Sequence, residues 1–392
     1  MASNTTFTDE IMIEILLKLP VKSILRCNTL SKHYYSMIHS QYFIGRHLNL
    51  GRLEDNFNDS LIVTPMVDSL RLFNRRSGCF MELEFSSSLV DNLSKLIIFG
   101  PIDGVYCVID DRNVFRRLAI SLWNPATLEE FVLPVTPLTY DDFGDDGVAE
   151  LTLDDYLGEF LTRENCLACG FGLDIITNNY KVVIIYGSIS EINNDMYMYI
   201  FNVSERRWIY HVEHIAVNSW RITTFVGVFL GGACHWICRF LHGNIFSYRY
   251  PGYQILAFDM SVESSRAISF PDVGDGYAWS KMTSIATLDG CLALIDARGN
   301  DVEGRCSSFN VWVMAEYGVT ESWSIMYKVS LSPGIVGRFL GITRGRFYVR
   351  EGEEWLVSYD LDSQDVERYG IQDNSICSLL PYEESLVRII SS

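Results

Sequence analysis

The chain has 392 residues, with 31 Lys and Arg against 49 Asp and Glu, so its formal net charge is −18. Hydrophobic residues make up 48% and charged residues 20%, which provides for a sizeable core and is too little charge for a disordered chain. The negative charge repels phosphate backbones, so the composition argues against nucleic-acid binding. Aromatic residues, at 13%, favour the half-buried faces of β-sheets over helical bundles.

The sequence contains no pattern that predicts export or membrane insertion. The first residues lack the basic region and the long apolar run of a secretory signal. The longest weakly charged stretch, residues 222–238, is interrupted by Gly231, Gly232 and His235 and is too short to span a bilayer. We therefore expect a cytoplasmic protein without membrane contact, in which the ten cysteines stay reduced.

The first fifty residues predict a small helical domain. Apolar residues at helical spacing over Thr8–Leu19 predict one helix, which Pro20 ends. Pro20 can also open a second helix, and Ser31 can cap a third that continues through Phe43. Fifty residues bury too little apolar area for comfortable stability, so we expect residues 1–50 to dock on a partner or on the rest of the chain.

Residues 51–392 predict many short strands that repeat with a period of about 45 to 58 residues, which is typical of propeller blades. One half of the unit is an apolar strand that enters an Asn or Asp turn, and the other half is a Gly turn that leads into a strand. The first half recurs at Leu122–Thr127, Ile200–Ser204, Ala257–Ser261 and Ser358–Asp362, and the second at 103–107, 231–236, 289–292 and 344–348.

The fold class expected is mainly β with a small α head, namely three helices followed by a roughly six-bladed β-propeller. The blades are predicted at 93–134, 166–214, 225–272, 281–330 and 338–371, with a last blade that pairs 60–85 with 375–390. Such pairing would close the ring and leave no raw sheet edge. A stack of two β-sandwiches remains an alternative because the repeat is degenerate.

The candidate catalytic and metal-binding patterns are incomplete. Cys166 and Cys169 have the spacing of half a zinc site, but no second pair follows at a suitable separation. Cys234, His235 and Cys238 fall on a predicted strand, where neighbours point to opposite faces, so we interpret them as core residues. We expect no catalytic residue, no metal and no cofactor, while a propeller enzyme with a site in the central channel stays an alternative.

One segment departs from the repeat. Between Arg117 and Arg163 there are ten acidic residues and no Lys or Arg. We interpret the segment as an electrostatic landing site for a basic protein, because complementary fields speed encounter; a solvated insertion is the alternative. The candidate substrate-binding residues are Asp141, Asp142, Asp145, Asp146, Glu150, Asp154 and Asp155.

The run from Phe7 to Arg26, followed by Ser31 and Lys32, resembles an F-box, the helical module by which substrate receptors join cullin-based ubiquitin ligases. Phe7-Thr8 stands where this family usually has Leu-Pro, and Tyr34 stands where a Trp is common. Tyr keeps most of the aromatic area, so the resemblance implies weakened rather than lost docking. A helical cap that only packs on the β body is the alternative.

The body resembles the F-box-associated domain of plant F-box proteins, through Leu122–Thr127, Gly170–Asp174, Tyr180–Val183, Gly232–Trp236 and Leu288–Cys291. The phrase from Val311 to Trp323 and the ending Tyr382–Val387 are most similar to S-locus F-box proteins. Those proteins are the pollen-side determinants of self-incompatibility, which recognise pistil ribonucleases (S-RNases) and send non-self ones for ubiquitination.

The resemblance implies a non-catalytic substrate receptor of a cullin ubiquitin ligase. Residues 1–50 would bind a Skp-family linker protein, which joins the cullin scaffold, and residues 51–392 would bind a basic protein such as a pistil S-RNase. A receptor for another plant protein and a scaffold that delivers no substrate are alternatives. The predicted linker-binding residues, or their immediate support, are Ile11, Ile15, Leu16, Leu19, Pro20, Leu25, Leu30 and Tyr34.

Overall fold

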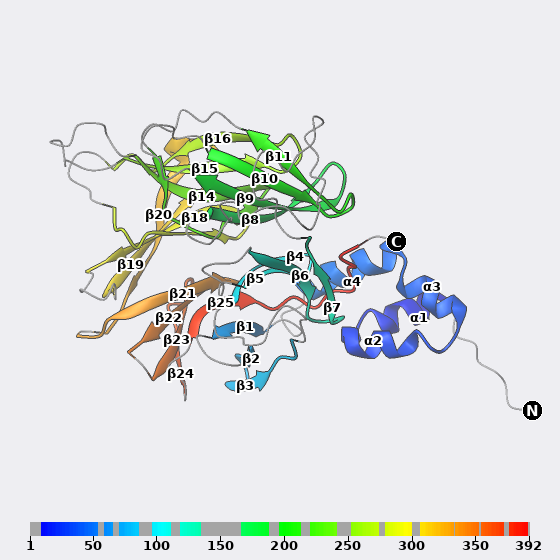
Figure 1. Ribbon diagram of the computed structural model, residues 1–392. Helices are drawn as coiled ribbons and strands as arrows, with labels where there is room; N and C mark the ends of the chain where they lie inside the picture. The colour runs from blue at the N-terminus through cyan, green and yellow to red at the C-terminus, as the bar shows by residue number, and fades with distance from the viewer. Residues whose placement is uncertain are drawn as a thin grey trace, which may run out of the picture.

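A computed structural model shows a body of β-strands with a group of helices at one side of it (Figure 1). The structure describes residues 9–53, 59–65, 70–85, 96–110, 118–134, 166–187, 196–212, 220–240, 252–273, 279–299, 306–332, 334–352, 354–371 and 376–390.

The described part of the head contains four helices, one more than predicted. They are α1 (Asp9–Leu16), α2 (Val21–Cys27), α3 (Lys32–Ile38) and α4 (Gln41–Leu53). Ser31 caps α3 as predicted, because its hydroxyl accepts a hydrogen bond from the Tyr34 N–H. The prediction of one helix from Ser31 through Phe43 is wrong: the hydroxyl of Ser40 accepts from the Phe43 N–H at 3.2 Å and starts a new helix there.

The described strands form six antiparallel sheets. The first sheet holds β1 (Ser60–Pro65), β2 (Arg71–Asn74), β3 (Cys79–Glu82) and the last strand, β25 (Ile376–Pro381). The second holds β4 (Leu96–Ile102), β5 (Val105–Asp110), β6 (Ala119–Asn124) and β7 (Glu129–Val132). The third holds β8 (Cys166–Asp174), β9 (Asn179–Gly187), β10 (Met196–Asn202) and β11 (Arg207–Val212).

The remaining three sheets repeat this arrangement. The fourth holds β12 (Trp220–Ile222), β13 (Val228–Leu230), β14 (Ala233–Phe240), β15 (Tyr253–Asp259) and β16 (Ser264–Ser269). The fifth holds β17 (Ser284–Leu288), β18 (Cys291–Arg298), β19 (Ser308–Met314) and β20 (Trp323–Ser330), with the 3-10 turn η3 (Thr320–Ser322) before β20. The sixth holds β21 (Gly337–Thr343), β22 (Arg346–Glu351), β23 (Trp355–Asp360) and β24 (Val366–Gly370).

These sheets are the blades of a six-bladed β-propeller. Each corresponds to one predicted unit, except that β12 (Trp220–Ile222) lies before the predicted start of the fourth blade at 225. The predicted closure is confirmed: β25 pairs with β1 in antiparallel register, with Leu61 opposite Pro381 and Ile62 opposite Leu380. One blade therefore contains strands from both ends of the β body, which excludes the alternative of two stacked β-sandwiches.

The core of the ring is divided among the blade interfaces. Each pair of neighbouring blades shares one cluster of buried apolar side chains, and the six clusters complete the circle. Trp236 illustrates one of them: it is fully buried between the third and fourth blades, and its indole N–H donates to the Cys169 carbonyl at 3.1 Å. A Cβ on Gly170 would meet the Trp236 ring at 2.5 Å, so this glycine makes room for the indole.

In the repeated Asn or Asp turns, the side chain accepts hydrogen bonds from backbone N–H groups two or three residues further on. The Asp259 carboxylate accepts from the Ser261 and Val262 N–H groups, and Asp360 and Asn124 make the same type of turn. Positive φ values are not confined to the Gly turns, because the outer hairpins of four blades place other residues in this region. These are Leu128 (φ 61°), Arg206 (55°), Glu263 (52°) and Gln364 (62°).

Asn124 also binds the C-terminal part of the chain. Its side-chain N–H groups donate to the carbonyls of Ser385 and Val387, at 3.0 and 2.9 Å. Both acceptors lie in residues 382–390, the C-terminal segment, which follows β25. Asn124 is fully buried, so these bonds have no water to replace them.

The substitution Asn124→Asp tests this role. It keeps the turn acceptor but removes both donors and places a carboxylate against two carbonyl oxygens, which should lower the free energy of unfolding by about 3 kcal/mol. Asn202→Asp is the matched control, because the Asn202 side-chain oxygen accepts from Asn179, Ser204 and Glu205 and those donors would remain. Thermal unfolding of both variants should show a large loss for the first and little for the second; equal losses would contradict the assignment.

Candidate functional site

The helical head presents an apolar surface to solvent. Ile11 and Ile15 on α1 are 46% and 45% exposed, and Leu30, between α2 and α3, is 65% exposed. Ile11 and Ile15 line a shallow depression of about 340 Å³ together with Glu10, Glu14 and Lys18. Large apolar side chains exposed this far on a small helical unit are typical of a surface that another protein covers.

The predicted linker-binding residues divide into a surface set and a supporting set. Ile11, Ile15, Pro20 and Leu30 are exposed. The others pack into the head: Leu16 is buried, and Leu19, Leu25 and Tyr34 are half-buried against the same core. The structure thus places the eight residues in one small unit, where half of them can contact a partner directly.

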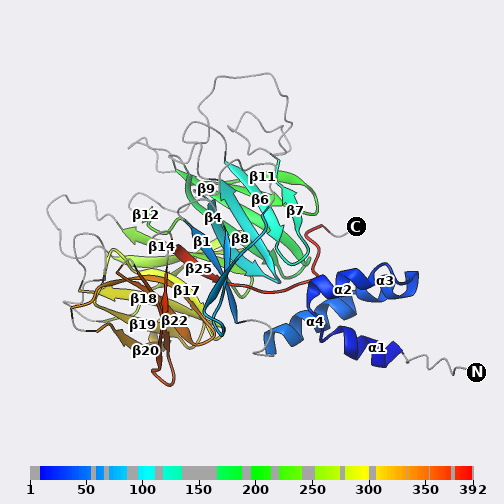
Figure 2. The ribbon, with the colours of Figure 1, turned by 90° about the horizontal axis from the view of Figure 1, so that it is seen from below.

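The core of the head is completed by the propeller. The buried cluster of Leu16, Val21, Ile24, Ile38 and Phe43 also includes Ala126, from the turn between β6 and β7, and Leu386, from the C-terminal segment. The head therefore docks on the second blade instead of standing free. Figure 2 shows the C-terminal segment, in red, running from β25 to the helices.

An ion-pair cluster joins α4 to the same region. The Arg52 guanidinium donates to both oxygens of Glu383 and, at 2.8 Å, to the carboxylate of Asp103. Glu383 also accepts from the Gly104 N–H at 2.9 Å. Burial opposes the charge on Arg52, but its hydrogen bonds to Glu383 and Asp103 outweigh that effect and raise its pKa. Arg52 therefore remains charged at neutral pH, and its hydrogen bonds connect the head, the turn at Asp103 and the C-terminal segment.

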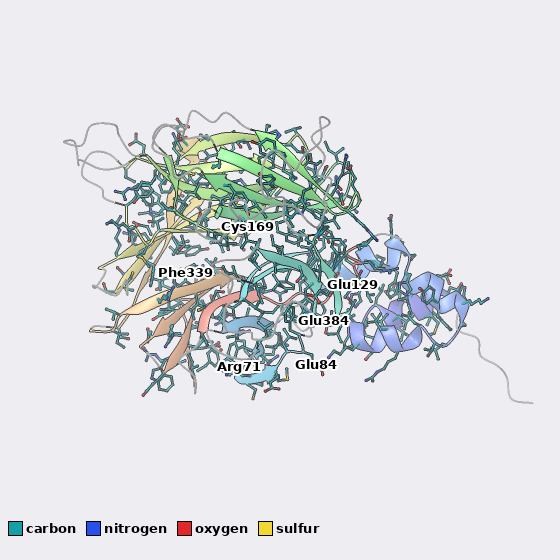
Figure 3. All side chains as sticks on the ribbon, viewed as in Figure 1. Arg71, Glu84, Glu129, Cys169, Phe339 and Glu384 are labelled. Carbon is teal, nitrogen blue, oxygen red and sulfur yellow. The ribbon has the colours of Figure 1, made fainter. Side chains whose placement is uncertain are left out.

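Glu384 forms a further link. Its carboxylate accepts from the Val21 N–H at 3.1 Å, at the first residue of α2, where Pro20 offers no side-chain cap. Figure 3 shows Glu384 between the β body and the helices. Tyr106 holds the base of the segment, because its hydroxyl donates to the Pro381 carbonyl at 2.6 Å and accepts from the Glu383 N–H at 3.1 Å. Hydrogen bonds to the head or to the second blade thus hold five residues of this stretch: Pro381, Glu383, Glu384, Ser385 and Val387.

The seven candidate substrate-binding residues lie between positions 141 and 155, outside the residues that the structure describes. The strands on either side of this segment are described. β7 begins beside the turn that contains Ala126, which contacts the head, and therefore ends at Val132 on the side of the ring away from the helices. The described chain leaves β7 at that far side.

The ring encloses space along its axis. Two adjoining cavities, of about 550 and 880 Å³, are lined by the inner strands β4, β17, β21 and β25 and share Phe99, Val228 and Phe339 among their walls. Figure 3 shows Phe339 and Cys169 toward the middle of the β body. Within the described ranges, no three His, Cys, Asp or Glu side chains come together as a metal site requires.

The cysteine and histidine pattern of β14 is part of the core. Cys234 and Cys238 are buried free thiols, and His235 is fully buried. The His235 Nδ1–H donates to the Val228 carbonyl at 3.0 Å, and its Nε2 accepts from the Tyr317 hydroxyl at 2.6 Å. Burial lowers the pKa of His235 to about 4, so its imidazole is neutral at pH 7. The hydrogen bond from Tyr317 connects the fourth blade to the fifth. Sequence reasoning missed this bond because Tyr317 lies in a distant turn.

None of the described helices has the length and apolar character needed to cross a membrane.

The substitution Gly104→Ala tests the contact between the second blade and the C-terminal segment. A Cβ at Gly104 would meet the Ser385 Cβ at 2.3 Å and the Glu383 carbonyl at 2.9 Å. Gly290→Ala is a matched control, because Gly290 occupies the equivalent turn of the fifth blade at φ 75°, against 80° for Gly104, and has nothing within 4 Å.

Both substitutions carry the cost of positive φ, about 1 kcal/mol, and only Gly104→Ala adds the steric conflict, for a total of about 3 kcal/mol. The apparent melting temperature should therefore fall further for Gly104→Ala. If both variants melt together, the segment does not pack where the structure places it.

Comparison with known proteins identifies relatives of both parts of the chain. The family model of the F-box associated beta propeller domain matches residues 152–388. The F-box protein CPR1 of Arabidopsis thaliana is 24% identical over 401 residues, which cover 94% of this chain and 85% of the relative. Another F-box protein of that plant is 30% identical over 245 residues, covering 60% of this chain and 69% of its own length.

An F-box/kelch-repeat protein of the same plant is 23% identical over 363 residues, covering 90% of this chain and 86% of the relative. Among solved structures, TolB from Acinetobacter baumannii matches with a TM-score of 0.43 and 12% identity, over 87% of this chain and 72% of that one. A match at that level carries no argument about function.

Proposed function

This chain belongs to the family of F-box proteins with an F-box-associated β-propeller domain, and from that premise we propose that it is the substrate-recognition subunit of a cullin-based ubiquitin ligase. The observation that carries the proposal is the exposed apolar surface of Ile11, Ile15 and Leu30 on a head that is fixed to the ring. A receptor needs these two features, one surface for the ligase and a rigid connection to the domain that holds the client.

The head is proposed to bind a Skp-family linker protein, which in turn joins the cullin scaffold. The relatives that cover most of the chain are F-box proteins, and this supports the assignment. Ligation chemistry then belongs to other subunits, so the receptor needs no catalytic group of its own. Nine of its cysteines are free thiols, which fits a reducing compartment, and we propose that it works in the cytoplasm.

The double substitution Ile11→Glu with Ile15→Glu tests the docking surface. Both side chains are half-exposed, so the head should fold unchanged, while the linker protein would have to bury two carboxylates in place of apolar area. We expect affinity for the linker to fall about 100-fold in a binding titration with purified subunits. Leu16 is unsuitable for this test because it is buried in the head's core and its truncation would leave a cavity.

The matched control is Ile176→Glu with Val262→Glu, which adds the same charge at two exposed apolar residues of the propeller. Linker affinity should be unchanged in that control. Unchanged affinity in the Ile11 and Ile15 variant, with an unchanged melting temperature, would refute the docking surface.

We further propose that the client is a basic protein and that Asp141, Asp142, Asp145, Asp146, Glu150, Asp154 and Asp155 attract it. Two observations support this proposal: the net charge of −18, and the departure of β7 toward the side of the ring away from the head. A client held on that side would leave the linker surface free.

The finer proposal is an S-locus F-box protein of pollen that binds non-self S-RNases for ubiquitination. It is supported by the resemblance of residues 311–323 and 382–387 and by the acidic charge. Both segments also have packing roles in this structure. Trp312 and Trp323 lie in the apolar cluster between the fourth and fifth blades, and residues 382–387 connect the propeller to the head. A receptor for another plant protein would need no change in either part, so the client itself must be tested.

Substituting Asp141, Asp142, Asp145 and Asp146 with Asn tests the electrostatic part of the proposal. The association rate of a basic S-RNase, measured by surface plasmon resonance at low salt, should fall about tenfold, and its salt dependence should become weaker. The control replaces Glu82, Glu84, Glu316 and Glu321 with Gln, which removes the same charge from exposed positions elsewhere. Equal rate losses in both variants would show only a net-charge effect and would contradict a local landing site.

A further inference from the structure

A pocket lined by arginines lies between the first and sixth blades, which stand side by side in Figure 1. Its volume is about 270 Å³. Arg75 and Arg76, from the turn between β2 and β3, form one wall. Arg344, from the turn between β21 and β22, and Arg346, the first residue of β22, form the other. We call it the arginine pocket.

The arginine pocket lies at the end of the ring that faces the helices. Arg344 also lines the axial cavity that reaches Arg52 of α4, and Asp59, which contributes to the pocket, is the first described residue after α4. The pocket is therefore on the side of the ring opposite the far end of β7, and it is separate from the proposed client surface and from the linker surface on α1.

The charge of this pocket is opposite to that of the whole chain. Four guanidinium groups line it against two carboxylates, Asp59 and Asp360, while the net charge of the protein is −18. Glu367 adds one carboxylate beside it by accepting from Arg75 and Arg346. Four cations against three anions leave the pocket with an excess positive charge.

The guanidinium groups lower the pKa values of the carboxylates beside them. Burial opposes ionisation of Asp59, but hydrogen bonds from Arg76 and Arg75 outweigh it and lower the pKa of Asp59. A hydrogen bond from the Tyr369 hydroxyl lowers the pKa of Glu367, and the charges of Arg346 and Arg75 lower it further. These carboxylates remain ionised at neutral pH, and the excess positive charge persists with them.

Arg344 is the member without a partner. Arg75, Arg76 and Arg346 are each bound to a carboxylate, whereas no hydrogen bond or ion pair joins the Arg344 side chain to any of the described residues. Its backbone has φ 51°, in the left-handed region that a non-glycine residue adopts only where the surroundings favour it. Its position places an uncommitted guanidinium at the rim of a pocket that already holds three others.

Guanidinium groups arranged in this way match a compact anion with several acceptor oxygens. Each Arg side chain presents five N–H donors in a planar fork, a geometry that matches the oxygens of a phosphate group. Because the arginines lie on two facing walls, a phosphate between them could accept hydrogen bonds from both walls, which a single carboxylate with two oxygens does less well. The field of the whole acidic chain acts against an extended polyanion, while a single phosphate group interacts mainly with the charges within about 10 Å of it.

We propose that the arginine pocket binds a phosphate monoester group, carried either by a free small molecule or by a phosphorylated Ser or Thr side chain of a protein. The ligand would bridge Arg76 of the first blade and Arg344 of the sixth, across the interface between these two blades. Binding should therefore also raise the melting temperature of the protein.

Calorimetric titration of the full chain at constant ionic strength tests the proposal, with three probes: inorganic phosphate, a phosphoserine peptide and the same peptide without phosphate. The variant is Arg344→Gln, which keeps the Cβ and breaks none of the ion pairs described above. The matched control is Arg338→Gln, at the opposite end of the same strand, β21, where Arg338 is exposed.

We expect inorganic phosphate or the phosphoserine peptide to bind the natural chain. The same probe should bind Arg344→Gln at least tenfold more weakly and Arg338→Gln with unchanged affinity. Binding of inorganic phosphate alone would assign the pocket to a small molecule, and preference for the phosphopeptide would assign it to a protein. Equal loss in both variants, or no binding of either phosphate probe, would overturn the proposal.

The receptor function does not depend on this pocket. Affinity for the linker protein, measured on the same preparation of Arg344→Gln, should equal that of the natural chain. A failure of linker binding in every sample would count against the receptor proposal and leave the phosphate result independent of it.

Discussion

The C-terminal segment is the constraint on which the arrangement of this protein depends. It follows directly after β25, the strand that closes the ring, and it completes the core of the head with Leu386. Arg52 and Val21 bind its two glutamates from the head, and Asn124 holds its backbone from the second blade. The same nine residues are thus packed by both parts of the chain, so neither part reaches its full set of contacts without the other.

This connection explains how a small helical head can be both stable and exposed. A unit of about fifty residues buries little apolar area by itself, and it would gain stability by covering Ile11 and Ile15. Here Ala126 and Leu386 add buried apolar area to the core of the head, on the side that faces the propeller. The apolar surface on α1 therefore stays available for a partner. In the proposed receptor, contacts that span several elements would hold the linker protein at a fixed distance from the propeller.

Much of the propeller could be predicted, because its signals are local. An Asn turn such as that of Asn124 and a Gly turn such as that of Gly104 are written into a few consecutive residues, and their period gives the blades and the closure. The break at Ser40 was missed because apolar spacing continues across it, and the positive φ of Leu128 was missed because no glycine marks it. The place of the C-terminal segment has no local signal, since Glu384 makes its contact across more than three hundred residues.

The role of the C-terminal segment is tested most directly by hydrogen–deuterium exchange of the head, in the full chain and in a chain that ends at Pro381. The shorter chain keeps β25 and can still close the ring, but it lacks Leu386 and both glutamates that bind the head. In the shorter chain, the amides of α1, α2 and α4 should lose most of their protection while those of the inner strands keep theirs. Unchanged protection of the helices would show that the head is stable on its own, and would contradict the central role of the C-terminal segment.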